Sequence, residues 1–465
     1  MSNHIIKLYK FAKKLINKKN KMKNVLILGA GMVANPIIQH LLSRNIRLTV
    51  AALNYDEAKR MVGQAENGQA VRWSVDDQEA LDKMVADNDV VVSLIPYAYH
   101  IMVAKCCVKH KKHLVTASYA KPEMYALDAA AKEAGVILLN EVGLDPGIDH
   151  MSAMRVIDHV HGKGGKIEAF YSLCGALPAP ESCDNPFNYK FSWSPKGVVL
   201  AGNNDAVYLM KGKTVEIPTA NLFKNPMTLD FPDVGALHVY PNRDSLSYIR
   251  IYGIPETKTM FRGTFRFKGW CETLDVMKAL KCTLPEKHDF SGKTYAGAVA
   301  LVNGLAEEKD IKKQVAAMLH IDENAYALNA MEWLGLFSDQ PMNRTEDSMY
   351  EVTSDLMIKK MMITENDRDM VVMMHIFKAV YPDGSAEIIR SRMLDFGTLK
   401  TDTSIARTVA LPAAIAVEMI LNNEINLTGV HIPVIPEIYK PILDNLEKLN
   451  IKMVEEYGLP LTEEL

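Results

Sequence analysis

The stretch Val25-Leu26-Ile27-Leu28-Gly29-Ala30-Gly31-Met32-Val33-Ala34 decides the fold of the first part of the chain. Its short apolar run shows no polar alternation, which is typical of a strand covered on both faces in a parallel sheet. The run ends at a glycine turn, and apolar residues with helical spacing follow at Ile37, Ile38, Leu41 and Leu42. The order strand, glycine turn, helix predicts the start of a doubly wound α/β domain.

Each small residue of this turn has a separate role in binding a dinucleotide. Gly29 bends the chain sharply, Gly31 lets the backbone approach a pyrophosphate, and Ala34 lets the helix pack against the strand. The free N–H groups at the start of the helix then favour the phosphate anion. Because the turn opens a βαβ unit, we expect an NAD(P)-binding Rossmann domain. A similar domain that binds a nucleotide without redox chemistry is the alternative.

The alternation of strands and helices continues to about residue 147. The expected strands lie at residues 47–52, 71–75, 89–95, 113–117 and 136–140, and the expected helices at 56–62, 78–86 and 122–134. In such a sheet, ligands bind at the carboxyl ends of the strands. These ends are the turns at Gly29, Asn54, Pro96, Ser118 and Asp145.

The tip of the second strand normally shows whether NAD or NADP is preferred. An acidic residue there would bond the ribose hydroxyls of NAD, whereas an arginine would hold the 2′-phosphate of NADP. The chain reads Ala52-Leu53-Asn54 and carries neither signal. Asn54, followed three positions later by Glu57, fits a helix capping box. Lys59 and Arg60 remain candidates for a phosphate contact.

Composition limits the class of protein. With 465 residues, 48% of them hydrophobic, the chain is long enough for two or three domains. A net charge of -3 provides no general attraction to nucleic acid or to an anionic membrane, so we expect neither partner. The apolar run 409–421 contains Pro412 and Glu418 and is shorter than the roughly 18 residues of a membrane span. Six cysteines without CxxC spacing indicate reduced thiols and no metal site.

Residues 1–22 form a basic leader. It is rich in lysine and in apolar residues at helical spacing, which is compatible with a membrane-surface helix or a targeting segment. The alternative is an extension without function, because Met22 directly before the first strand is a natural second start. We expect the leader to be non-essential.

The second half of the chain has a different pattern. Apolar runs at residues 166–174, 197–201, 236–240 and 260–268 predict the strands of a mixed sheet. Residues 371–379 and 386–393 predict a hairpin around Tyr381-Pro382-Asp383-Gly384. Residues 278–342 are helix-rich, with helices expected at 295–306 and 311–319, and the tail predicts helices at 405–421 and 436–449.

Several phrases of this half are too polar, and too rich in glycine and proline, for a plain core. They begin at Glu141 (EVGLDPGIDH), Cys174 (CGALPAPE), Tyr189 (YKFSWS), Tyr240 (YPNRDS) and Arg262 (RGTFR). With these phrases in this order, the chain resembles the glutamate-forming saccharopine dehydrogenases, also called saccharopine reductases. The resemblance runs from about Lys23 to the C-terminus.

The resemblance implies three domains. A Rossmann domain at residues 23–147 would be completed by 403–465, an α+β substrate domain would comprise 148–285 and 346–402, and a small helical subdomain would comprise 286–345. It further implies a cytoplasmic homodimer. The expected reaction is the reversible NADP-dependent oxidation of saccharopine to an imine, which water cleaves to L-glutamate and L-2-aminoadipate 6-semialdehyde in lysine metabolism.

The resemblance also implies the site residues. The substrate would contact Ser118, Tyr119, Asp145, Cys174, Trp193, Arg243, Thr264, Phe265 and Arg266, with Asp145 and Tyr119 as the catalytic pair. The cofactor would contact Gly29, Ala30, Gly31, Met32, Val33, Ala52, Leu53, Asn54, Ser74, Val75, Leu94, Ile95, Pro96, Leu144, Asp145, Pro146 and Ser194.

The chemistry of these residues agrees with the assignment. A substrate with three carboxylates and one amine needs guanidinium forks, which Arg243 and Arg266 supply. The alternative for either arginine is a salt bridge to a neighbour such as Asp244. Asp145 lies between two glycines and could hold the amine or pass its proton, or it could simply form a turn. Cys174 could line the pocket or be an inert buried thiol, and Trp193 could wall the pocket or pack.

The chain departs from the family at Leu53-Asn54, where NADP-preferring relatives place an arginine. NADP(H) is favoured because the acidic residue that selects NAD is missing too, and NAD(H) is left open. One rival is a carboxynorspermidine or homospermidine type dehydrogenase, whose polyamine substrates would require an acidic pocket. The other rival is a regulator that senses a dinucleotide without turnover.

Overall fold

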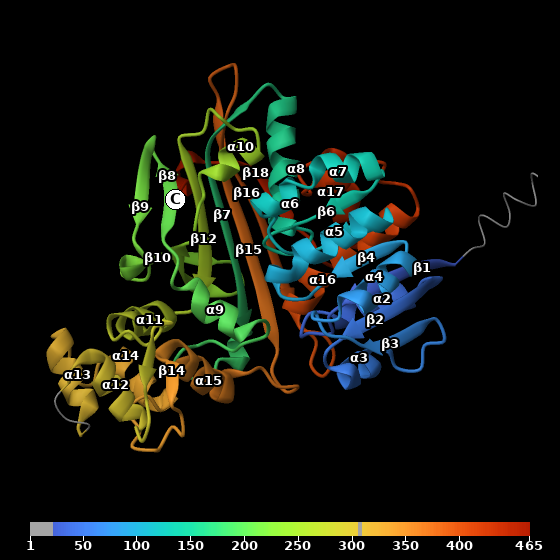
Figure 1. The fold of residues 1–465 in the computed structure, drawn as a ribbon. Helices are drawn as coiled ribbons and strands as arrows, with labels where there is room; N and C mark the ends of the chain where they lie inside the picture. Colours follow the sequence, from blue (N-terminus) through green and yellow to red (C-terminus); the bar gives the residue numbers. More distant parts are fainter. Residues whose placement is uncertain (1–21, 306–308) are drawn as a thin grey trace, which may run out of the picture. The chain divides into compact units, whose positions relative to one another are not determined.

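The computed structural model describes residues 22–305 and 309–465 (Figure 1). The predictions for the leader therefore lie outside the described residues. The chain forms two compact units. The first unit comprises residues up to Ile148 together with Val409–Pro433, and the second comprises Asp149–Thr408 together with Val434–Leu465.

The first unit is built on a seven-stranded sheet in which every pair of neighbours is parallel. In spatial order the strands are β17 (Gly429–His431), β6 (Ile137–Leu139), β5 (His113–Val115), β4 (Val90–Ser93), β1 (Lys23–Leu28), β2 (Ile46–Ala52) and β3 (Gly68–Arg72). The strand order reverses between β4 and β1, which is where a doubly wound sheet opens a ligand crevice at its carboxyl edge. The predicted fold class is confirmed for this unit.

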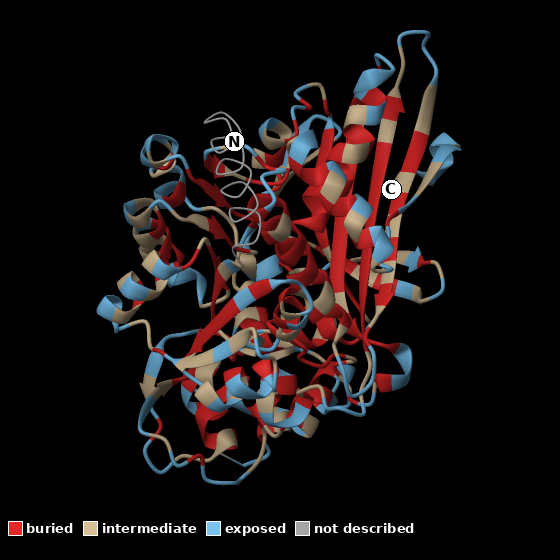
Figure 2. Ribbon diagram, turned by 90° about the vertical axis from the view of Figure 1, so that its right-hand side faces the viewer, coloured by how far each residue is buried: buried red, intermediate tan, exposed pale blue. Residues whose placement is uncertain are grey.

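Helices connect the strands of this sheet. They are α2 (Asn35–Leu42), α3 (Tyr55–Val62), α4 (Gln78–Asp87), α5 (His100–His110), α6 (Pro122–Tyr125) and α7 (Asp128–Ala134), with a short 3-10 turn η1 (Tyr97–Tyr99) before α5. Residues Val25 to Leu28 of β1 have no exposed surface, so this strand is covered on both faces as its sequence predicts. Figure 2 shows the central strands of the sheets mostly in red, as buried.

Helix α5 and strand β17 of the first unit were not predicted, and two predicted elements have clearly different bounds in the structure. Strand β3 ends at Arg72 instead of extending over 71–75, because Ser74 begins a polar turn in which its carbonyl accepts the Asp77 N–H. The single helix expected at 122–134 is split into α6 and α7. The second piece starts at Asp128, whose carboxylate accepts a hydrogen bond from the Val430 N–H at 2.9 Å beside β17.

The second unit contains a nine-stranded mixed sheet. Along its main path the strands are β10 (Met227–Phe231), β11 (Gly235–Pro241), β12 (Thr259–Arg266), β7 (Lys166–Pro178), β15 (Asp369–Val380), β16 (Ala386–Phe396) and β18 (Val454–Leu459), and β8 (Ala206–Met210) and β9 (Lys213–Ile217) branch from β12. Only β12 and β7 pair in parallel among these strands. The expected hairpin is present as β15 and β16.

The helices of the second unit are interspersed with short turns. The helices are α8 (Ile148–Gly162), α9 (Pro195–Ala201), α10 (Ser247–Ile251), α11 (Trp270–Ala279), α12 (Tyr295–Asn303), α13 (Ile311–Leu319), α14 (Tyr326–Leu334), α15 (Met349–Met361) and α17 (Pro436–Lys448). Helix α16 (Ser404–Leu421) begins in the second unit, and from Val409 on it belongs to the first. The minor elements are the strand pair β13 (Lys287–Asp289) and β14 (Glu346–Ser348) and the turns η2 (Pro180–Ser182), η3 (Thr219–Asn221) and η4 (Leu461–Glu463).

Residues 197–201 are helical, so the strand expected there was wrong. Pro195 lies in the first turn of α9, where a proline without an N–H and with a fixed φ favours a helix start. The apolar run is too short for its periodicity to distinguish the two structures.

The observed units differ from the predicted domain division in two respects. The part of the C-terminal tail that belongs to the first unit is 409–433, instead of the expected 403–465. The end of the tail belongs to the second unit, because β18 pairs with β16 and Tyr439 of α17 donates a hydrogen bond to Asp158 of α8. The expected helical subdomain at 286–345 is not separate. One continuous core joins sheet residues such as Tyr171 to Met331 of α14.

Helix α16 is the one helix of the described residues that is long and apolar enough to cross a membrane, and 83% of it is buried within the protein. A buried carboxylate accepts hydrogen bonds from the N-terminus of this helix. Asp369 accepts hydrogen bonds from the Ser404 N–H at 2.6 Å and the Ile405 N–H at 3.0 Å. Burial raises the pKa of Asp369 to about 6, whereas these two donors favour its charged form.

Asp369→Ala should lower the free energy of unfolding by about 2–3 kcal/mol, because it leaves two buried N–H groups without an acceptor. Asp369→Asn keeps one acceptor oxygen and should cost about half as much. Urea denaturation of both variants at pH 7.5 measures the difference. Equal stability of the alanine variant and the unmodified protein would show that this carboxylate does not hold the helix.

Candidate functional site

The glycine turn after β1 is fixed by its neighbours in the sheet. Gly29 has a φ of 106°, and a Cβ at this position would lie 2.9 Å from the Leu94 carbonyl oxygen at the end of β4. The Gly29 N–H donates to the Ala51 carbonyl of β2 at 2.8 Å. Only glycine fits a left-handed turn held this closely between two strands.

Gly31 differs from Gly29, because a Cβ at Gly31 would meet no atom within 4 Å. Helix α2 begins a few residues later, and its N-cap residue Ala34 is fully buried and gives no side-chain hydrogen bond to the first turn. Backbone N–H groups at an uncapped helix start, next to open space, are suited to a pyrophosphate. The residues present therefore fit a dinucleotide.

The strand-two tip is as uncharged as the sequence indicates. Leu53 is 72% exposed, and the Asn54 side chain accepts the Glu57 N–H at 3.2 Å as the N-cap of α3. The predicted cap is confirmed, although Glu57 does not complete the box because its carboxylate binds Arg60 at 2.6 Å. Ser74 lies in the loop that follows β3, beside this tip.

The turn after β5 is supported by a buried histidine that the sequence interpretation missed. Nδ1 of His100 lies 2.8 Å from Ser93 Oγ, and its Nε2 lies 2.8 Å from Ser118 Oγ. Burial lowers the pKa of His100 to about 4, and the charge of Lys121 acts in the same direction. The ring is therefore neutral at pH 7 and orients the Ser118 hydroxyl through one of its nitrogens.

The two residues predicted as the catalytic pair are joined directly. Tyr119 Oη donates a hydrogen bond to Asp145 Oδ1 at 2.9 Å. The loop that carries Asp145 is tight, because the Gly143 N–H donates to the Pro146 carbonyl at 3.0 Å and a Cβ at Gly147 would collide with the Gly143 backbone. A side chain on such a loop is held in place, which a proton-transfer group requires.

In the second unit, the substrate residues expected on two separate phrases become strand neighbours. Thr264 of β12 lies opposite Cys174 of β7 in the parallel register, and the adjacent Phe265 is fully buried. A Cβ at Gly175 would lie 2.8 Å from that of Phe265, so the backbones approach closely here. The structure brings these residues together at one position of the mixed sheet.

Arg266 is the most unusual residue of this group. Its guanidinium carbon lies 4.9 Å from the ring of Tyr189, 5.2 Å from Trp270 and 5.9 Å from Tyr240. The side chain is buried, its Nη1 donates to the Phe265 carbonyl, and its Nε has no hydrogen-bond partner. In the part of the chain that the structure describes, no carboxylate forms an ion pair with it. A buried cation without a counterion is costly unless a ligand supplies the negative charge.

Arg243 lies in the turn after β11 with a φ of 51°, and its side chain is exposed. The salt bridge to Asp244 considered above does not form among the described residues, because Asp244 accepts the Leu246 N–H at 2.7 Å instead. Trp193 is partly buried against the core of the second unit. Ser194 is the exposed N-cap residue of α9, and its side chain forms no hydrogen bond to the first turn of that helix.

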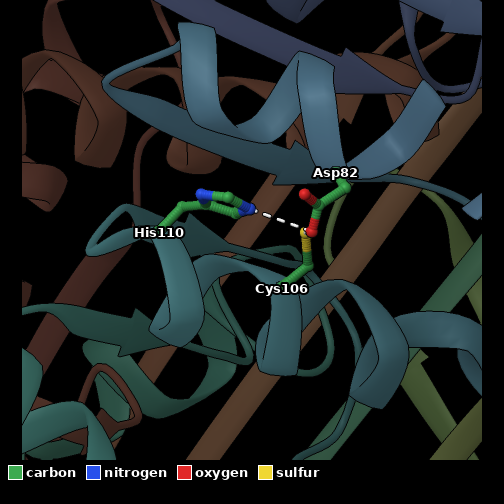
Figure 3. Close-up of side chains that lie close together, drawn as sticks. All are labelled: Asp82, Cys106 and His110. Carbon is green, nitrogen blue, oxygen red and sulfur yellow. Dashed lines mark hydrogen bonds and ion pairs between the residues drawn. The ribbon is translucent and has the colours of Figure 1, made fainter. Parts of the chain in front are cut away.

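One further group of side chains has the composition of a metal site. Asp82, Cys106 and His110 converge between α4 and α5 (Figure 3), with His110 Nε2 2.9 Å from Asp82 Oδ1. The same oxygen also accepts from Lys109. Burial raises the pKa of the Cys106 thiol to about 11, which disfavours the thiolate that a metal needs. The group is best described as an ion pair that joins the two helices.

Comparisons with known proteins cover almost the whole chain. Residues 25–139 match the family model described as saccharopine dehydrogenase NADP binding domain, and residues 143–451 match the saccharopine dehydrogenase C-terminal domain. The saccharopine dehydrogenase [NADP(+), L-glutamate-forming] of Saccharomyces cerevisiae is 37% identical over 95% of this chain and 99% of its own length. The Schizosaccharomyces pombe protein of the same name is 36% identical over 94% and 99%.

A solved structure agrees with these matches. The apo saccharopine dehydrogenase (L-Glu forming) from Saccharomyces cerevisiae superposes with a TM-score of 0.85 at 36% identity, and the match covers 94% of this chain and 99% of that one.

The two glycines of the turn should respond differently to substitution. Gly31→Val enters open space at an ordinary φ, so it should leave the thermal unfolding midpoint unchanged while it weakens dinucleotide binding at least tenfold. Gly29→Ala requires a strained φ and a close contact with Leu94, so it should lower the unfolding free energy by about 1–3 kcal/mol. Calorimetric titration measures the dinucleotide affinity of each variant, and thermal melts measure its stability. Wild-type dinucleotide affinity in the Gly31 variant would contradict the assignment.

His100 should make the protein less stable in acid. The unfolded histidine takes up a proton near its usual pKa of about 6.5, whereas the folded one takes it up only at about 4, so stability is lost as the pH falls through this interval. At pH 5 the loss should be about 2 kcal/mol relative to pH 7.5. His100→Gln should remove that part of the loss in urea denaturation. An identical pH dependence of both proteins would refute the assignment.

Proposed function

This chain belongs to the saccharopine dehydrogenase family, and we propose that it is a glutamate-forming saccharopine dehydrogenase that works with NADP(H). The observation that carries the proposal is 36–37% identity to the yeast enzymes of that name across practically the whole of both proteins. The resemblance identified from the sequence phrases is thereby confirmed, and so is the prediction of an oxidoreductase that acts on a CH–NH group.

The first unit would hold the cofactor. Gly31 and the start of α2 would bind the pyrophosphate, and the β2–α3 turn would lie beside the adenosine ribose. The nicotinamide ring supplies the acceptor for the hydride that leaves the carbon of the C–N bond. The secondary amine loses its proton in the same oxidation, and water then adds to the resulting imine, so that the C–N bond breaks and glutamate leaves with the nitrogen.

Tyr119 and Asp145 are suited to the proton steps of this reaction. The carboxylate accepts a hydrogen bond from the phenol and can receive a second one from a protonated amine. An amine that hands its proton to this pair becomes the neutral species that can lose a hydride. Ser118, oriented by His100, adds a hydroxyl that can donate to a substrate carboxylate or accept from the amine.

Arg266 and Arg243 supply the positive charge for the substrate carboxylates. Saccharopine carries three carboxylates. The rings of Tyr189 and Trp270 fix the plane of the Arg266 guanidinium before the ligand binds. Because the guanidinium is already held in place, little conformational entropy is lost when it binds a carboxylate. Its fixed plane also favours one orientation of the substrate. The uncompensated charge of Arg266 fits a carboxylate substrate and not a polyamine.

Compartment and assembly are part of the proposal. The six cysteines form no disulfide in the structure, which suits a reducing compartment, and a cytoplasmic location is part of the proposal on this ground. The expected homodimer stays a prediction, which light scattering of the purified protein tests directly. Partners other than the small-molecule substrate are not part of the proposed activity.

The activity is tested by mixing the purified protein with saccharopine and NADP+ and following absorbance of the reduced nicotinamide. Glutamate and the semialdehyde should form in equal amounts. Turnover of carboxynorspermidine or homospermidine in place of saccharopine would contradict the assignment. Dinucleotide binding without turnover of any of these amines would identify a sensor instead.

Arg243→Lys and Arg266→Lys keep the charge but lose the two-point geometry. Each should lower kcat/KM for saccharopine by about 10- to 100-fold, because a charged hydrogen bond contributes about 1.5–3 kcal/mol. Steady-state kinetics at saturating NADP+ measure the loss, and Lys258→Gln, a surface lysine paired with Glu168, is the control. Unchanged kcat/KM in both arginine variants would exclude them as carboxylate clamps.

A further inference from the structure

The strand-two tip leaves an open question about how this chain selects NADP over NAD. Leu53 carries no charge, and the Asn54 side chain is already used as a helix cap. Arg60, on the following helix, binds Glu57 through two hydrogen bonds of 2.6 Å and 3.0 Å. The tip itself therefore offers no cation to a 2′-phosphate, and besides Lys59 on α3 the remaining candidates lie on other elements.

Strand β3 places such a cation beside the tip. Arg72 is the last residue of β3 and lies directly opposite Ala52, the last residue of β2, in the parallel register. The ladder continues one residue further, because the Trp73 N–H donates to the Ala52 carbonyl at 3.0 Å. The Cα atoms of Arg72 and of the tip are therefore held at a fixed separation of one strand spacing.

The side chain of Arg72 lies toward the β2–α3 turn. Its guanidinium carbon is 5.6 Å from the ring centroid of Tyr55, the first residue of α3 and the neighbour of Asn54. Among the residues that the structure describes, Arg72 forms no ion pair, and it is exposed to solvent. The aromatic face limits the rotamers of a charged group that is free to bind an anion.

We propose that Arg72 is the residue that selects NADP(H), with its guanidinium, held on the Tyr55 ring, binding the 2′-phosphate of the adenosine ribose. This inference rests on the proposed function for the identity of the cofactor. NADP differs from NAD only by that phosphate, so a fork of two N–H donors at this position acts on one cofactor and not on the other. In this chain, the cation absent from β2 is supplied by the neighbouring strand.

Direct binding tests the proposal without turnover. Calorimetry of Arg72→Gln should show NADPH and adenosine 2′,5′-bisphosphate bound about 10- to 100-fold more weakly, the loss of one charge-assisted hydrogen-bonding partner. The affinity for NADH should stay within about twofold, because NADH lacks the phosphate. The matched control is Arg47→Gln, an exposed arginine at the opposite end of β2 that removes the same charge. It should bind all three ligands as the unmodified protein does.

Three outcomes would overturn the inference. The first is an unchanged NADPH affinity in Arg72→Gln. The second is an equal loss of affinity for NADPH and NADH in that variant, which would indicate loss of structure instead of phosphate recognition. The third is a selective loss of NADPH in Lys59→Gln together with an unaffected Arg72→Gln. The proposed function is judged separately by saccharopine turnover, so selective NADPH loss in Arg72→Gln without turnover in the unmodified protein would support the inference and contradict the function.

Discussion

The contact between the Gly29 turn and the end of β4 is the constraint on which the first unit depends. Because β1 lies between β2 and β4, its turn lies so close to the end of β4 that a Cβ at Gly29 would be 2.9 Å from the Leu94 carbonyl oxygen, and only a residue without a side chain fits there at a φ of 106°. The same reversal of strand order opens the carboxyl edge of the sheet. Gly31, the Asn54 turn and Ser118 follow from it, since each lies at the end of a strand whose position is set by β1.

A second constraint is the compensation of buried charges in the second unit. Most buried ions there are compensated, as when Lys190 binds both Asp184 and Asp367. Arg266 is buried among aromatic rings with a single backbone acceptor, an arrangement that costs free energy unless a ligand supplies a negative charge. A site that binds a carboxylate substrate gains affinity from such a preorganised cation. In the proposed function, the free energy that burial of Arg266 costs in the empty protein is recovered when the substrate carboxylate binds.

Much of the candidate site could be predicted because its residues occur in short phrases with clear local chemistry. Tyr119 and Asp145 were each predicted as catalytic residues on the family resemblance, and the structure joins them by a hydrogen bond. His100 and Arg72 were missed. Each is an isolated polar residue in an ordinary helix or strand pattern, and only its neighbours in space give it a role. The end of β3 was missed because the chain turns at Ser74, and the helix at 195–201 was missed because a short apolar run fits a strand or a helix equally well.

The sequence by itself determined most of the order of elements in the first unit, the dinucleotide turn and the family, since these depend on local periodicity, on glycine and proline positions and on short phrases. The tertiary structure decided which strands are neighbours, and therefore that Arg72 lies beside Ala52 and Thr264 beside Cys174. It also decided that the tail divides between the two units. The physical reason is that strand pairing and burial depend on residues far apart in the chain, whose contacts no local pattern specifies.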